Sequence, residues 1–210
     1  MIEKKFTLKH WLALLLIFIT IVIASIQPLE YESYLLHQVG TVLMLIVLFI
    51  TFKRIGLDFS SFSLYLGFLF IHIIAAHYLY SYVPYNEWIK TLGHFDLNQF
   101  FGWQRNMYDR LVHFAYGFLL YPFFHRCFQV CFPDSRPRTI FLLVLQFVMA
   151  SSMVYELIEW VIAIGMSPDA AEKYNGQQGD LWDAHKDMLM ATIGTLMFGL
   201  LQLLGNKKHS

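Results

Sequence analysis

Six long apolar segments run through this 210-residue chain, and they constrain its fold more than any other feature. About 20 apolar residues in succession form an α-helix long enough to cross the ~30 Å hydrocarbon core of a bilayer. The composition agrees, because 57% of the residues are hydrophobic and only 14% are charged, a low fraction for a soluble domain. The sequence therefore predicts an all-α, polytopic membrane protein with a single transmembrane domain over residues 1–210. The six predicted transmembrane helices are residues 11–26, 35–52, 62–82, 111–124, 140–163 and 188–204.

The distribution of Lys and Arg predicts the orientation, because cytoplasmic segments carry an excess of these residues. With the N-terminus inside, the cytoplasmic segments hold ten of the fifteen basic residues. These ten are Lys4, Lys5, Lys9, Lys53, Arg54, Arg126, Arg136, Arg138, Lys207 and Lys208. We therefore expect both termini to be cytoplasmic and the first span to be an uncleaved anchor. The long connections 83–110 and 164–187 then lie on the outer face, where loops often carry function.

The formal net charge of the chain is zero, which bears on its partners. Nucleic-acid binding needs a basic surface, and no such surface is indicated here. We expect membrane lipid to be the partner and no nucleic acid to bind.

Ionisable side chains occur at the outer ends of the last three predicted spans. Asp109 and His113 are four residues apart, so they share a helix face, and the short fourth helix should extend back through Asp109. In the fifth span, Glu156 lies about 24 Å along the helix from its inner end, and Glu159 follows one turn later. All four side chains should therefore lie at one depth, in the outer part of the membrane.

The sixth span adds a stripe of acids at its mouth. Asp180, Asp183 and Asp187 are followed on the same face by Ala191 and Gly194. Small residues let a neighbouring helix approach closely, so we expect tight packing below the acids.

Ionisable groups inside spans are costly, and three helices that carry them at matching depth indicate a shared polar cavity. Six carboxylates face two nearby fixed cations, Arg110 and Lys186, which leaves about four uncompensated charges. Oxygen ligands with one imidazole suit Mg²⁺, Mn²⁺ or Zn²⁺. The candidate ligands are Asp109, His113, Glu156, Glu159, Asp180, Asp183 and Asp187.

Structural interpretations stay open beside this one. Asp180 would also suit the start of the sixth helix, and Arg110 would also pair with Glu156 or Asp187 between helices. His72 and His77 in the third span would either face the cavity or pack among aromatic residues.

The motifs "YDRLVHFAYGF", "YELIEW" and "QQGDLWDAHKDM" resemble those of the YjdF-type bacterial inner-membrane proteins, over nearly the whole chain. More distantly, the chain is similar to VanZ-like membrane proteins, which are associated with teicoplanin resistance. Asp109, Arg110 and His113 match the first VanZ-like motif with Arg for Lys, while Glu159 and Ala191 replace a Gln and an Asn of the other two. The resemblance implies a multi-pass protein of the bacterial inner membrane and supplies no reaction.

Three functions fit these features. The first is a metal-dependent hydrolase or transferase acting on a lipid or lipid-linked phosphate headgroup at the outer leaflet. Its catalytic residues would be Asp109, Arg110, His113 and Glu156, with His113 as general acid or base and Arg110 on the phosphate. The alternatives are a structural or accessory protein whose acids clamp helices, and a cation or proton transporter.

Overall fold

Helices occupy every predicted apolar segment in the computed structural model, which confirms the all-helical class. The structure describes residues 1–207, apart from the side chains of Asp169, Glu172, Lys173, Asn206 and Lys207. Lys208 and the side chain of Lys207, both used above to orient the chain, lie outside this part. The long helices are α1 (Leu8–Ala24), α2 (Tyr31–Arg54), α3 (Phe59–His77), α6 (Tyr108–Leu119), α7 (Tyr121–Cys131), α8 (Pro137–Ile164) and α10 (Asp183–Lys207). The short helices are α4 (Tyr85–Gly93), α5 (Leu97–Phe101) and α9 (Pro168–Asn175).

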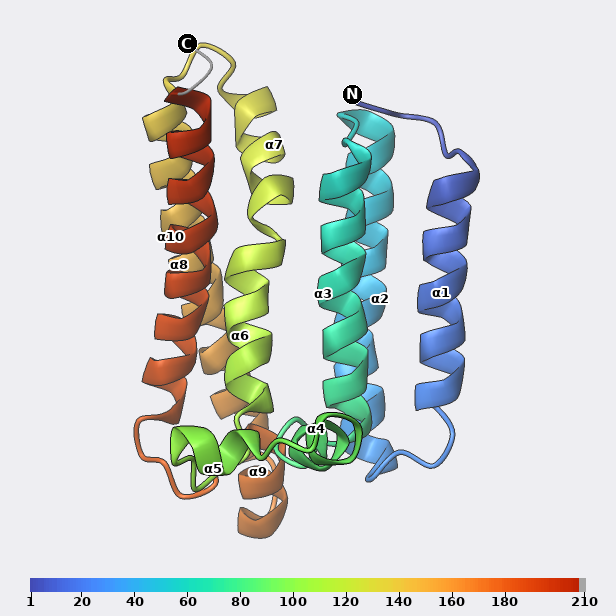
Figure 1. Cartoon of the computed structure of the whole chain (residues 1–210), viewed down its shortest axis with the longest axis vertical. Helices are drawn as coiled ribbons and strands as arrows, with labels where there is room; N and C mark the ends of the chain where they lie inside the picture. The colour runs from blue at the N-terminus through green and yellow to red at the C-terminus, as the bar shows by residue number, and fades with distance from the viewer. Residues whose placement is uncertain (208–210) are drawn as a thin grey trace.

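Four of these helices, α2, α3, α8 and α10, are long and apolar enough to cross a membrane, and α1 is a shorter apolar helix. In the most apolar 18-residue window of α3, 56% is buried inside the protein, against 22–28% in the corresponding windows of the other three helices. Helix α3 is therefore the central helix of the bundle, and it packs against α1, α2, α6 and α7. Figure 1 shows α1, α2 and α3 on one side and α6, α7, α8 and α10 on the other.

The segment predicted as a single fourth span is divided into two stacked helices. Helix α6 ends at Leu119 and α7 begins at Tyr121, with Pro122 in the first turn of α7. Proline has no backbone N–H, and its ring clashes with the carbonyl four residues earlier, so a continuous helix is broken there.

The third helix ends at His77, before the end predicted at residue 82. Leu79 and Tyr80 follow with positive φ angles of 51° and 55°, and this left-handed turn leads the chain out of the helix. The expected outer connections are not extended loops but fold into α4, α5 and α9. These three short helices lie at the end of the bundle opposite the N-terminus and the last turn of α10 (Figure 1).

Helices α6 and α10 are in close contact, as the small-residue stripe predicts. A Cβ added at Gly194 would overlap the backbone of Phe114, and one added at Gly117 would overlap the carbonyl of Ala191. The Thr195 hydroxyl donates a hydrogen bond of 3.3 Å to the Gly117 carbonyl across this contact. The close approach places the acidic ends of α6 and α10 side by side.

Candidate functional site

One buried group combines side chains from three helices. Asp109 and His113 lie one turn apart on α6, Asp187 lies on α10, and Glu156 lies on α8. The His113 Nε2 atom is 3.6 Å from Asp109 Oδ1, 3.8 Å from Glu156 Oε1 and 3.9 Å from Asp187 Oδ1. The predicted convergence of these four side chains is therefore confirmed.

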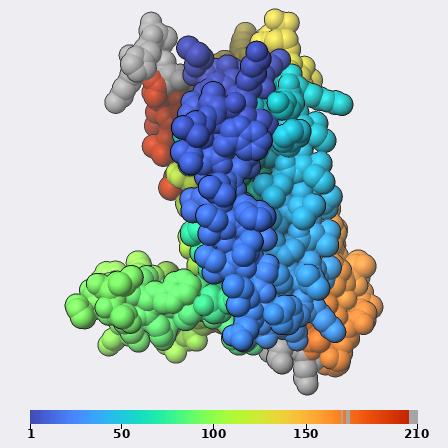
Figure 2. All heavy atoms as spheres, turned by 90° about the vertical axis from the view of Figure 1, so that its right-hand side faces the viewer, coloured from blue at the N-terminus to red at the C-terminus, as the bar shows by residue number. Residues whose placement is uncertain are grey.

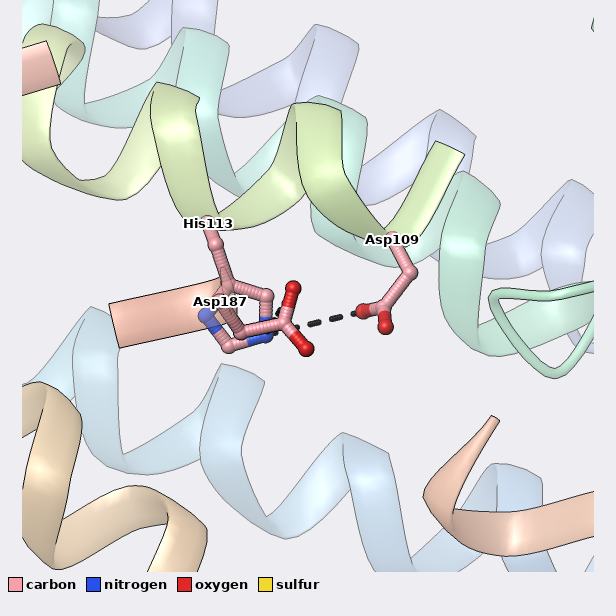
Figure 3. A group of neighbouring side chains, drawn as sticks. All are labelled: Asp109, His113 and Asp187. Carbon is pink, nitrogen blue, oxygen red and sulfur yellow. Dashed lines mark ion pairs between the residues drawn. The ribbon is translucent and has the colours of Figure 1, made fainter. Parts of the chain in front are cut away.

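Three members of this group have the arrangement of metal ligands. Asp109, His113 and Asp187 each offer one ligand atom, and these atoms all lie within 4.8 Å of one another. Figure 3 shows the two carboxylates and the imidazole turned toward a common point. We call these three residues with Glu156 the inner cluster.

One oxygen of the inner cluster has no hydrogen-bond partner among the described residues. Glu156 Oε1 is buried and accepts no hydrogen bond from them. Asp187 Oδ1 is also buried, but it is in direct ion-pair contact with the Arg110 guanidinium. A buried acceptor without a partner is costly, and a cation bound beside Glu156 would satisfy its oxygen.

The outer acids are arranged differently, because arginines engage them. Asp183 Oδ1 lies 2.6 Å from Arg105 Nη1 and 2.5 Å from Arg110 Nη2. Asp180 Oδ2 lies 3.2 Å from Arg110, 3.4 Å from Arg105 and 2.6 Å from Lys186 Nζ. We call these five residues the outer network. Among the described residues, each of its two carboxylates contacts two or three lysine or arginine side chains, whereas Asp187 contacts one, so the outer carboxylates are the less suited to bind a metal.

Asp180 lies in the turn before α10 and holds that turn in place. Its Oδ1 accepts a 3.1 Å hydrogen bond from the Trp182 backbone N–H. The hydrogen bond from Lys186 is the main cause that lowers the pKa of the Asp180 carboxyl to about 2, with help from Trp182 and the charge of Arg110. Helix α10 itself begins at Asp183, three residues after the start expected from the sequence.

Arg110 joins the outer network to the inner cluster. Its guanidinium donates to the Asp183 backbone carbonyl at 2.8 Å and contacts the carboxylates of Asp183 and Asp187. The side chain is thus held within the protein and positions Asp187. The sequence suggested phosphate binding for Arg110, and these contacts favour the positioning role.

Sequence reasoning missed Arg105, the second arginine of the outer network. Six carboxylates face three fixed cations among the described side chains, so about three negative charges remain uncompensated where the sequence indicated four. No motif or helical period in the sequence singles out Arg105, which lies in the connection between α5 and α6.

A cavity of about 330 Å³ adjoins the inner cluster between α8, α9 and α10. Glu156 and Glu159 line it from α8, and Asp183 and His185 line it from α10. Glu159 therefore belongs to the cavity wall. The remaining lining residues are Met153, Leu157, Trp160, Asn175, Gln177, Ala184 and Met188.

The two histidines of α3 make their contacts in the other half of the bundle. His72 Nδ1 is hydrogen-bonded to the Tyr80 hydroxyl, and His77 Nδ1 is 2.8 Å from the Ala24 carbonyl. Both side chains stabilise the packing around α3.

Apolar helices of spanning length around a buried acid–histidine cluster define a multi-pass integral membrane protein. The chain matches the family described as "Predicted membrane protein (DUF2238)" over residues 9–208, and it belongs to that family. It is also 31% identical to the inner membrane protein YjdF of Escherichia coli strain K12 over 177 residues, covering 84% of this chain and 80% of the relative. No solved structure gives a significant match. The protein is accordingly a bacterial inner-membrane protein, as its motifs predict.

Proposed function

We propose that this protein is a divalent-cation-dependent membrane enzyme that hydrolyses or transfers a lipid-linked phosphate headgroup at the outer leaflet. The carrying observation is that the inner cluster, in which Glu156 Oε1 has no hydrogen-bond partner among the described residues, adjoins a cavity at the surface of the bundle. Clustered metal ligands beside a cavity are the arrangement that metal-assisted chemistry requires.

In this proposal Asp109, His113 and Asp187 hold the cation, which would be Mg²⁺, Mn²⁺ or Zn²⁺. A divalent cation held by these residues would neutralise phosphate charge and activate a bound water molecule. Glu156 is 3.8 Å from His113 and also lines the cavity, so it is placed to take the proton from that water. Attack by the water oxygen on phosphorus would form a new P–O bond as the bond to the leaving oxygen breaks, and the leaving oxygen would take up a proton from water and depart as an alcohol.

The outer network supports a second, structural role. Arg105 and Arg110 link the segment before α6 and α6 itself to Asp180 and Asp183 at the start of α10. These ion pairs clamp the mouth of the site, whereas the inner cluster supplies the chemistry. Clamping and catalysis are thus assigned to different acids.

We further propose that the chain crosses the membrane six times with both termini in the cytoplasm. In this topology the stacked helices α6 and α7 together form the fourth crossing and α1 forms the first. The Lys and Arg bias supports it. The site then opens toward the outer leaflet.

The test of the proposed function is metal content followed by turnover. The detergent-purified protein, incubated in turn with Mg²⁺, Mn²⁺ and Zn²⁺ and then dialysed, should retain about one ion per chain by elemental analysis. Asp187→Asn and His113→Ala should lose it, while Glu87→Gln on α4, away from the cluster, should keep it. The loaded protein should release phosphate or a phosphorylated headgroup from vesicles of bacterial lipid. A parent protein that binds none of the three ions contradicts the proposal.

A further inference from the structure

We propose that the cavity between α8, α9 and α10 binds the primary ammonium group of a zwitterionic lipid headgroup. The inference rests on the proposed function for the place of the phosphate, which would lie at the inner cluster. It adds the substrate class, a lipid whose headgroup joins a phosphate to a primary amine.

The cavity is reached from the side of the bundle. Met153, Leu157 and Trp160 on α8 line it and are 48%, 49% and 60% exposed. They lie on a helix apolar enough to cross the membrane, so their exposed surface faces lipid. A headgroup can therefore enter from the bilayer while its acyl chains stay in hydrocarbon.

The cavity wall is rich in hydrogen-bond acceptors that lack donors. Glu156 Oε1 and Asn175 Oδ1 are both buried, and neither accepts a hydrogen bond from the side chains and backbone that the structure describes. Burying acceptors without donors costs free energy, so the wall is complementary to a ligand that brings N–H groups. An ammonium group brings three.

The charge of the wall selects for a cation in the same way. Glu156, Glu159 and Asp183 contribute three carboxyl groups to the lining, and within the described part of the chain Asp183 alone of these is paired with arginine. Trp160 adds an aromatic ring, a surface that attracts cations. An anionic group would be repelled here, and a trimethylammonium group would leave the acceptors without donors.

The two parts of the headgroup fit two adjoining sites. Glu156 belongs to both, since its Oε1 lies 3.8 Å from His113 and its side chain lines the cavity. A phosphate at the inner cluster therefore places the rest of its headgroup against Glu156 and Glu159.

The experiment compares lipids that differ only in the amine. Purified protein loaded with the divalent ion is mixed with phosphatidylethanolamine, phosphatidylcholine or phosphatidylglycerol of identical acyl chains, and retained lipid is measured by native mass spectrometry. We expect phosphatidylethanolamine to be retained about tenfold more than phosphatidylcholine, which keeps the charge but has no N–H donor. Equal retention of these two lipids overturns the proposal. Competition by soluble phosphoethanolamine as strong as that by the lipid would overturn the lipid as source.

Variants separate this inference from the proposed function. Glu159→Gln should reduce the preference for phosphatidylethanolamine about tenfold and leave metal content unchanged, because Glu159 lines the cavity outside the ligand triad. Glu159→Asp, which keeps the charge, should retain most of the preference and serves if the glutamine variant does not fold. A preference that survives Glu159→Gln overturns the inference, whereas loss of metal from Asp187→Asn reports only on the cation site.

Discussion

Acids that look equivalent in the sequence differ once their partners are known. Asp183 and Asp187 lie one turn apart on α10, yet Asp183 bridges two arginines while Asp187 also faces His113 and Asp109. A carboxylate shared by two arginines is needed for stability, because removing it leaves two cations without their main partner. A carboxylate that outnumbers the nearby cations is destabilised by repulsion from other acids and by desolvation, and such destabilised groups are typical of functional sites.

The first prediction follows from this difference. Asp183→Asn should lower the free energy of unfolding by roughly 3–5 kcal/mol, the usual cost of breaking a buried ion pair. Glu156→Gln should change it little or raise it, because within the described part of the chain Glu156 contacts no lysine or arginine, only His113 at 3.8 Å, and its charge is repelled by other acids. The measurement is the thermal midpoint of the detergent-purified variants. Equal large losses for both would mean that all these acids are structural.

The second prediction concerns the turn held by Asp180. Its pKa is about 2 in the folded protein and would be near 3.8 without its partners. Because the pKa of Asp180 is lower in the folded protein than in the unfolded chain, its ionised carboxylate stabilises the turn at pH values above about 4. This stabilisation is lost as the pH falls from about 4 to about 2. The protection factors for hydrogen exchange of residues 176–186, which correct for the pH dependence of the intrinsic rate, should fall over that window. In Asp180→Asn the protection should already be low at pH 6 and should show no such step.

At the scale of elements, the length of the apolar segments predicted the helices, but it did not predict where those helices are interrupted. Periodicity predicted that Asp109 and His113 share a face, because four residues make about one turn. It could not predict that α3 stops at His77, since Leu79 and Tyr80 take left-handed angles that ordinary residues rarely adopt. Arg105 was missed because it lies between α5 and α6, where no helical period predicts the direction of a side chain.

The contact between α6 and α10 gives the third prediction. Gly194→Val should force these helices apart, since even a Cβ there overlaps the Phe114 backbone. We expect a loss of about 1–3 kcal/mol, typical of overpacking, together with loss of bound metal because Asp187 moves away from His113. Gly205→Val on the same helix is the matched control, because a Cβ at Gly205 meets nothing within 4 Å. If both variants keep metal and midpoint, close packing does not build the site.

At the scale of the whole molecule, the inner cluster lies toward one end of the bundle, and the N-terminus and the last turn of α10 lie at the other. The N-terminus and the last turn of α10 lie at one end, with α7 beside them, and α4, α5 and α9 lie at the other (Figure 1). The short helices α4 and α5 project sideways from the bundle in Figure 2. An even number of crossings, as we propose, would place both termini on one side of the membrane, and the Lys and Arg distribution favours the cytoplasmic side.

The last prediction tests which end of the bundle faces the outside of the membrane, and it uses two residues at opposite ends of the bundle. Cys131 is an exposed, free cysteine at the end of α7, and Leu92 on α4 is 86% exposed. In spheroplasts, a membrane-impermeant maleimide should label Leu92→Cys, made in a background with Cys127→Ser and Cys131→Ser. The same reagent should not label the native cysteines until the membrane is permeabilised. Labelling of native Cys131 without permeabilisation, and none at position 92, would invert the topology. The cation site would then open to the cytoplasm, and outer-leaflet lipid would no longer reach the cavity beside Glu156.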